Sequence, residues 1–229
     1  MEGRDVIEFD ATDEDTDNHR AVPFITSTRC RLALKILFIR PNLYADRSGD
    51  AMEPVVFAIL RGLTPSDIEC VLFDERMEEI PLDEDADLVA ITVETFTARR
   101  AYQIASHYAR RGIPVVLGGY HPTFCAEESL QFAHSVVVGD AEEVWLQVVR
   151  DAQRGELKRI YRGTAGSLEE LHVDRSIFAG KPYRPVALVQ FGRGCKYACD
   201  FCSIHAFYGS SLRWRNIDAV VEELAQSGR

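Results

Sequence analysis

Short apolar runs alternate with amphipathic segments over most of the chain between residues 32 and 162. Apolar runs of four to eight residues are typical of buried strands, whereas apolar residues spaced three and four apart are typical of helices that bury one face. The pattern predicts strands at 32–40, 69–74, 87–93, 113–119 and 135–140, and helices at 52–63, 97–112, 126–133 and 141–155. Strand and helix therefore alternate about five times.

This alternation predicts an α/β fold, in which a parallel sheet is covered by helices on both faces. We assign residues 32–162 to one doubly wound, Rossmann-like domain. Ligands of such domains bind beyond the C-terminal ends of the strands, so candidate binding residues are sought there. They are Asn42, Thr92, Thr95, Gly118, Gly119, His121 and Gly139.

Simpler roles compete for three of these candidates. Thr92 and Thr95 could cap the next helix, and His121, which follows a glycine pair, could begin one. The first strand is not followed by G-x-G-x-x-G, and the sequence has no G-x-x-x-x-G-K-[ST], so neither a dinucleotide nor an ATP site is marked. The pattern thus predicts a binding fold without naming its ligand.

The remaining segments differ from this domain in composition and hydrophobic pattern. Residues 163–184 carry three glycines and little periodicity, which indicates a linker or an ordered connection. Beyond it we expect a strand at 186–191 and a helix at 216–226. Residues 1–31 are expected to form an acidic, disordered tail.

Charge and composition narrow the class of protein. The net charge of −10 over 229 residues comes from two patches, 1–18 and 74–87, which carry −7 each and leave +4 for the rest. No dense basic stripe supports binding to nucleic acid. No run approaches the ~20 apolar residues of a membrane span. With no secretory signal pattern at residues 1–10, we expect a cytoplasmic protein with reduced thiols.

The most informative segment is CKYACDFC, residues 195–202, in which three cysteines have the spacing C-x3-C-x2-C. Three thiolates this close in a reducing compartment indicate a metal centre. Iron–sulfur clusters take cysteine thiolates, and a cubane with only three leaves one iron open to another ligand. Structural zinc bound by Cys195, Cys199, Cys202 and His205 is the alternative. Zinc ligands usually come as two well-separated pairs, which favours iron–sulfur here.

A strand, then C-x3-C-x-aromatic-C, then a helix resembles the opening of the radical S-adenosylmethionine (radical SAM) enzymes. The resemblance implies that Cys195, Cys199 and Cys202 hold a [4Fe–4S] cluster whose fourth iron is chelated by S-adenosylmethionine. It implies that Phe201 lies near the adenine. It also implies an electron donor such as flavodoxin or ferredoxin, and cleavage of S-adenosylmethionine to a 5′-deoxyadenosyl radical.

The resemblance extends upstream through HPTFCAEESL (121–130), VVVGDAEEVWLQVV (136–149) and RGCKYACDFCS (193–203). These segments are similar to radical SAM enzymes that carry an N-terminal cobalamin-binding domain. The similarity implies cobalamin as a further cofactor and methyl transfer to an unreactive carbon of an unknown small-molecule substrate. The chain lacks D-x-H-x-x-G, whose histidine ligates cobalt in mutase-type domains. A corrinoid-binding module without catalysis and a zinc-stapled interaction domain remain alternatives.

The length beyond the linker sets a further expectation. A full eight-unit βα barrel takes ~250 residues, whereas residues 185–229 suffice for about one strand–loop–helix unit. We therefore expect 185–229 to form the first βα unit of a partial TIM-type barrel. The radical SAM domain would be incomplete, the chain alone would not turn over, and a polypeptide that completes the barrel is a candidate partner.

Overall fold

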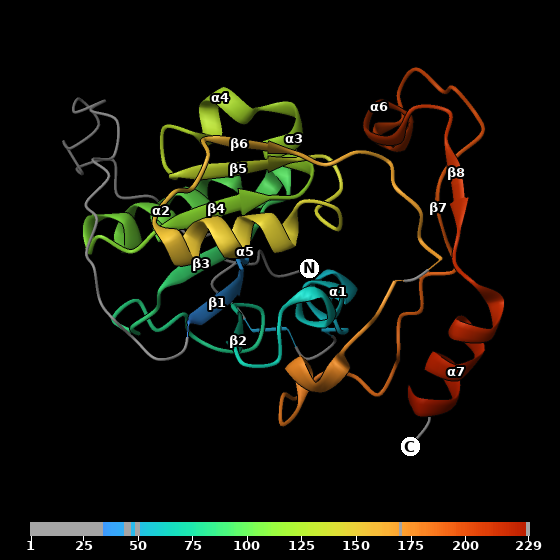
Figure 1. Ribbon diagram of the computed structural model, residues 1–229, viewed down its shortest axis with the longest axis horizontal. Coiled ribbons are helices and arrows are strands. Elements are labelled where there is room, and N and C mark those ends of the chain that lie inside the picture. The colour runs from blue at the N-terminus through green and yellow to red at the C-terminus, as the bar shows by residue number, and fades with distance from the viewer. Residues whose placement is uncertain (1–33, 44–46, 49–50, 170, 228–229) are drawn as a thin grey trace, which may run out of the picture.

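The computed structural model describes residues 34–43, 47–48, 51–169 and 171–227, so the predicted acidic tail lies outside the described residues. Its main body is a six-stranded sheet in the order β2-β1-β3-β4-β5-β6, with every pair parallel (Figure 1). The strands are β1 (Lys35–Arg40), β2 (Glu69–Asp74), β3 (Leu88–Thr92), β4 (Val115–Gly118), β5 (Ser135–Val138) and β6 (Ile160–Arg162). The α/β class and the doubly wound parallel sheet are thereby confirmed.

Helices cover both faces of this sheet. One face packs against α1 (Val55–Leu63) and α5 (Trp145–Arg154), and the other against α2 (Ala98–Arg110) and the region of α3 (Tyr120–Phe124) and α4 (Ala126–Ser129). Successive side chains of a strand point to opposite faces. Phe38 accordingly joins the cluster of α1 and α5, whereas Leu37 joins the cluster of α2. Burial on both faces explains the uninterrupted apolar runs.

Several element boundaries differ from the predicted ones. The helix expected at 126–133 ends at Ser129, and α3 precedes it, separated by Cys125 with φ −125° and ψ 49°. The helix expected from residue 141 begins at Trp145, and a short 3-10 helix η1 (Thr95–Thr97) precedes α2. Strand β6 was not predicted as an element. Its three residues are too few to give a periodic signal.

The prediction of a strand at 186–191 is wrong. Among the described residues no strand pairs with this segment, and Val186, Leu188 and Phe191 are exposed. Without a neighbour to accept its backbone hydrogen bonds, an apolar run cannot form a ladder. The ladder is instead a short antiparallel pair, β7 (Gly192–Gly194) with β8 (Leu212–Trp214). The region also holds α6 (Ser203–Tyr208) and α7 (Ile217–Ser227), and α7 confirms the predicted C-terminal helix.

The segment 163–184 is an ordered connection that contains a second 3-10 helix, η2 (Arg175–Phe178). Ile177 and Phe178 are buried in the cluster that contains α1, and the amide of Asp174 donates to the carbonyl oxygen of Ala58 at 2.9 Å. Tyr183 Oη donates to Asp74 at the end of β2 over 2.9 Å. Because β6 and β2 are the two edges of the sheet, this segment runs from one edge to the other.

The helices are short compared with a membrane-spanning helix. The longest in the described part of the chain, α2, has 13 residues, and none there has the length and apolar character needed to cross a bilayer.

Candidate functional site

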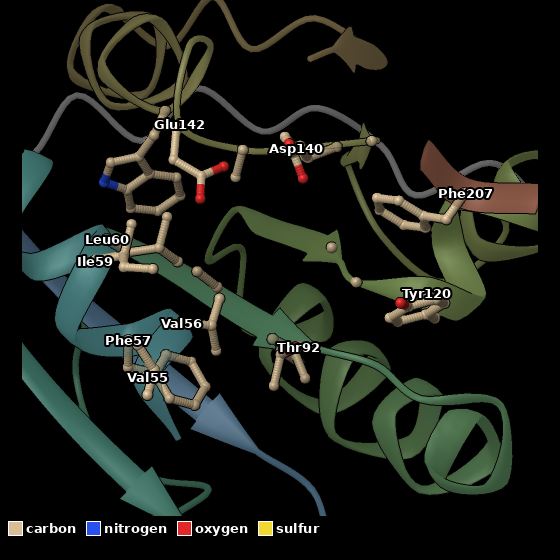
Figure 2. A pocket seen from close by; sticks show the side chains of 18 of the residues that line it. Val55, Val56, Phe57, Ile59, Leu60, Thr92, Tyr120, Asp140, Glu142 and Phe207 are labelled. Carbon is tan, nitrogen blue, oxygen red and sulfur yellow. The ribbon is translucent and has the colours of Figure 1, made fainter. Parts of the chain in front are cut away.

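A cavity of about 260 Å³ lies at the C-terminal ends of β3, β4 and β5 (Figure 2). We call it the cleft. Helix α1 forms one wall, and residues from 190 to 208 close the opposite side. The sheet order β2-β1-β3 means that successive connections diverge between β1 and β3, and parallel sheets bind ligands beside such a switch point. The elements that follow Cys195 in Figure 1 stand on the side to which the arrows of β5 and β6 point.

Glycines form the turns at the floor of the cleft. Gly119, directly after β4, has φ 107°, and a Cβ there would lie 2.9 Å from the carbonyl oxygen of Val93. Gly139, directly after β5, has φ 83°, and its Cβ would lie 2.6 Å from the carbonyl oxygen of Gly163. Both positions need glycine for conformation and for space. The two turns that form part of the cleft lining therefore depend on glycine.

The two sides of the cleft differ in polarity. The apolar side comes from α1 and α5 and consists of Val55, Val56, Phe57, Ile59, Leu60 and Trp145. Trp145 is held by its indole N–H, which donates to Thr64 Oγ1 at 2.9 Å. Figure 2 shows the α1 side chains across the cleft from Tyr120 and Phe207. A large apolar wall with a few polar groups suits an organic cofactor.

Several polar groups that line the cleft, among them Glu94 and Tyr120, have raised pKa values. Burial raises the pKa of Glu94 because it disfavours the charged carboxylate, and Arg40 opposes this effect. Burial also raises the pKa of Tyr120, with further contributions from Glu94 and Cys202.

A buried ion cluster joins the cysteine-bearing segment to the end of β5. Arg193 of β7 lies 3.0 Å from Asp140 and 2.7 Å from Glu142, and Arg213 of β8 lies 2.7 Å from Asp140. Their side chains are 8% to 16% exposed. Burial lowers the pKa of Arg193, but Glu142 and Asp140 outweigh burial, so the net pKa is raised. The two arginines and the two carboxylates thus compensate one another's charge, and they fix the residues on either side of the cysteines.

An aromatic contact adds a second connection. The ring of Phe207 in α6 lies 4.7 Å from the ring of Tyr120 and 6.1 Å from that of Phe124. Helix α6 begins directly after Cys202, so this contact also positions the cysteine motif beside the cleft.

The three cysteines are free thiols in the turn between β7 and α6. Cys199 is exposed, whereas Cys195 and Cys202 are partly buried, and the amide of Cys202 donates to the carbonyl oxygen of Cys199 at 3.1 Å. In the described structure, the motif and His205 do not bring three ligand atoms within 4.8 Å of one another. Ligands of one tetrahedral zinc ion lie about 3.4–3.8 Å apart. The observed arrangement is therefore more open than a closed zinc site.

The structure brings half of the predicted binding residues together. Thr92, Gly118, Gly119 and Gly139 line the cleft. The other four do not. The backbone N–H of Asn42 donates to the Glu75 carboxylate at 3.0 Å, and Thr95 is exposed in η1. His121 is buried against Tyr102, and Phe201 is 89% exposed.

Sequence reasoning did not identify several cleft residues. Asp140, Glu142, Arg193 and Tyr120 line the cleft but are not among the candidate residues taken from the strand ends. Tyr120 and Asp140 directly follow glycines at strand ends, and this position was the signal that could have identified them. The α1 wall had no comparable signal, because its apolar residues look like ordinary core.

The matches to known proteins agree with this geometry. Residues 58–149 match the family model described as "B12 binding domain". The chain is 32% identical over 203 residues to Bacteriochlorophyllide d C-12(1)-methyltransferase of Chlorobaculum tepidum, covering 83% of this chain and 44% of that protein. It is 33% identical over 177 residues to Bacteriochlorophyllide d C-8(2)-methyltransferase of the same organism, covering 73% and 39%.

A solved structure gives the same result for the fold. The radical S-adenosylmethionine methyltransferase TsrM of Kitasatospora setae superposes with a TM-score of 0.62 at 17% identity, covering 85% of this chain and 45% of that one. The chain spans less than half the length of the two curated relatives and of this structure.

Proposed function

Since this chain carries a B12-binding domain at residues 58–149 and is related to radical SAM methyltransferases, we propose that it binds a corrinoid and an iron–sulfur cluster next to each other. The protein to which this chain belongs would transfer a methyl group to an unreactive carbon of a small molecule. The observation that carries this proposal is the ion cluster. Arg193, two residues before Cys195, is fixed to Asp140 at the end of β5, so the cysteine motif lies against the cleft.

The lining of the cleft suits a corrinoid. Gly119 and Gly139 leave the strand ends bare, and the apolar side of α1 and α5 can pack against a large ring. None of the described residues that line the cleft is a histidine, which agrees with the missing D-x-H-x-x-G. We therefore propose binding without a histidine on cobalt.

The cleft must widen to accept such a ligand. Its volume of about 260 Å³ lies below the ~300–1,000 Å³ typical of sites for drug-sized ligands, and a corrinoid is larger than those. The backbone on both sides of the cleft is held, by the core packing of α1 and by the ion cluster of Arg193, so we infer that side chains lining the cleft rearrange when the ligand enters.

The donor set of the motif suits a cluster with one open iron. Cys195, Cys199 and Cys202 supply three thiolates, and Phe201 is exposed beside them. When bound, the cluster would supply the electron that cleaves S-adenosylmethionine, and the corrinoid would carry the methyl group. The exposed Cys199 offers an approach for flavodoxin or ferredoxin, and we place the protein in the reducing cytoplasm.

The residues of this chain have positioning roles. Arg193 and Arg213 hold the turn that carries the cysteines through Asp140 and Glu142. Tyr120 and Phe207 close the space between the cleft and α6, which limits the access of water.

Anaerobic reconstitution tests the cluster. We expect one [4Fe–4S] cluster per chain with broad visible absorption, lost in Cys199→Ser and kept in Cys70→Ser, which alters a half-buried thiol of β2. The test must include zinc analysis, because Nδ1 of His205 is buried without a hydrogen-bond partner among the described residues. Stoichiometric zinc without visible absorption, sensitive to His205→Gln, would contradict the proposal.

Titration with hydroxocobalamin tests the cleft. Gly119→Ala places a Cβ against the carbonyl oxygen of Val93 at the floor, so we expect weaker binding. Gly112→Ala is the matched control, because Gly112 also has a positive φ, 74°, but its Cβ would meet nothing within 4 Å. Equal loss of binding in both variants would show that backbone strain, not the cleft, is responsible.

A further inference from the structure

Three potential metal ligands gather outside the cleft, on the α3–α4 segment. They are His121 in α3, Cys125 between the two helices, and Glu128 in α4. The imidazole nitrogen, the thiol sulfur and a carboxylate oxygen all lie within 4.8 Å of one another. Nε2 of His121 lies 3.3 Å from Oε1 of Glu128. No other three His, Cys, Asp or Glu side chains gather this closely in the part of the chain that the structure describes.

We infer that these three residues form a binding site for a divalent metal ion of the zinc class, separate from the cysteine motif. Imidazole, thiolate and carboxylate are all zinc ligands, and the sulfur disfavours magnesium and calcium. Ligand atoms of a tetrahedral zinc ion lie about 3.4–3.8 Å apart. The His121–Glu128 distance is within about 0.1 Å of this spacing, and Cys125 needs to approach by at most about 1 Å.

The backbone holds the three ligands on one side of the segment. Although α3 and α4 are separate helices, their arrangement around Cys125 brings the three ligand atoms together. The amide of His121 donates to the carbonyl oxygen of Val93 at 3.1 Å, and the amide of Cys125 donates to that of His121 at 2.8 Å. The break at Cys125 is thus tied to its neighbours, and an ion bound there would join α3 to α4.

Tyr102 of α2 supplies the support that metal ligands normally have. Its hydroxyl lies 2.8 Å from Nε2 of His121 and donates to Glu128 at 3.0 Å, with Ser129 Oγ at 3.2 Å. Its ring stacks on Phe132 at 4.2 Å, which fixes the position of the hydroxyl. A metal ion would take the place of the Tyr102 contact at Nε2, and the hydroxyl would remain bonded to Glu128.

The exposures of the ligands leave a path for the ion. The side chain of His121 is 9% exposed, whereas that of Glu128 is 52% exposed. An ion can therefore enter from the Glu128 side, and water can fill the fourth position. The Cys125 thiol releases its proton to solvent on binding, as metal-bound cysteines do.

Cobalt(II) is the probe, because it reports sulfur ligation by colour. The test uses the full chain with Cys195, Cys199 and Cys202 replaced by serine, which removes the other metal-binding motif. We expect one Co²⁺ per chain, with a sulfur-to-cobalt charge-transfer band and visible d–d bands. Cys125→Ser should abolish the charge-transfer band, and Glu128→Gln should weaken binding by about tenfold. Cys70→Ser, at a half-buried thiol of β2, should change neither.

Two results would overturn the proposal. One is a folded triple-serine chain, checked by circular dichroism, that binds no Co²⁺. The other is binding that survives both Cys125→Ser and His121→Gln. Should the triple-serine chain fail to fold, the chain with all its cysteines gives the same decision. It should bind one equivalent of Co²⁺ fewer after Cys125→Ser, and an unchanged count would refute the site.

Discussion

Asp140 is the residue on which the attachment of the cysteine-bearing segment depends most. Two arginines and two carboxylates balance within the buried cluster, and Asp140 contacts both Arg193 and Arg213. Asp140→Asn keeps the shape of the side chain but removes one negative charge. The cluster is then left with one uncompensated positive charge beneath the surface. We expect the β7–β8 segment to separate from the sheet more often.

The magnitude follows from burial. Removing one partner of a buried ion pair costs ~3–5 kcal/mol. Arg193 keeps Glu142 at 2.7 Å, so the lower end, about 3 kcal/mol, applies. At 1.36 kcal/mol per factor of ten, this corresponds to an opening equilibrium about 150-fold more favourable.

Hydrogen exchange measures this opening directly. The two-stranded β7–β8 ladder is at best marginally stable once it leaves the main body, so peptides that cover residues 192–194 and 212–214 should exchange up to about 150-fold faster in Asp140→Asn. Glu143→Gln is the matched control, because it removes the same charge from an exposed side chain that contacts the Thr164 hydroxyl. Unchanged exchange in Asp140→Asn, or equal acceleration in Glu143→Gln, would refute the reasoning.

Three further predictions concern the stability of the main body. Burial lowers the pKa of His134, whose Nδ1 accepts from the Val115 amide at 3.1 Å, so the unfolded state binds a proton first as pH falls below ~6.5. The urea midpoint should therefore drop between pH 7.5 and 5.5, and less so in His134→Asn; parallel drops would contradict this. Trp145→Phe loses the bond to Thr64 and should cost about 1–3 kcal/mol in urea unfolding, whereas an effect below ~0.5 kcal/mol would show that this bond contributes little. Tyr183→Phe loses the bond to the buried Asp74 carboxylate and should cost about 1.5–3 kcal/mol by the same assay, with Tyr197→Phe, at an exposed ring, as the neutral control.

The parallel sheet could be predicted because its strands are buried on both faces. Each of the first five strands appears in the sequence as an apolar run, and the glycines at the ends of β4 and β5 fall at one edge of the sheet because these strands are parallel. Residues 186–191 show the limit of this reasoning. Their apolar side chains favour a strand, but pairing depends on a neighbouring strand, which a local pattern cannot reveal.

The cleft was predictable only in part, because helix phase decides which side chains face it. Helix α3 begins at Tyr120, and successive residues of a helix point about 100° apart. Tyr120 therefore lines the cleft, whereas His121 turns toward Tyr102. A shift of one residue in the helix start would exchange these roles. The pairing of Arg193 with Asp140 was also beyond reach, because the two residues meet only through the tertiary fold.

The connecting segment 163–184 has a mechanical consequence for the molecule. Strands in a sheet lie ~4.8 Å apart, so the edges β6 and β2 are about 24 Å apart, and this segment is anchored near both. It forms a tie across the sheet that does not pass through the cleft. A displacement of the end of β2, where Tyr183 binds Asp74, can therefore be passed to the turn that carries the cysteines through the backbone that follows Tyr183. Insertions before Asp174 would lengthen a loop, whereas insertions between Phe178 and Tyr183 would displace the turn that carries the cysteines.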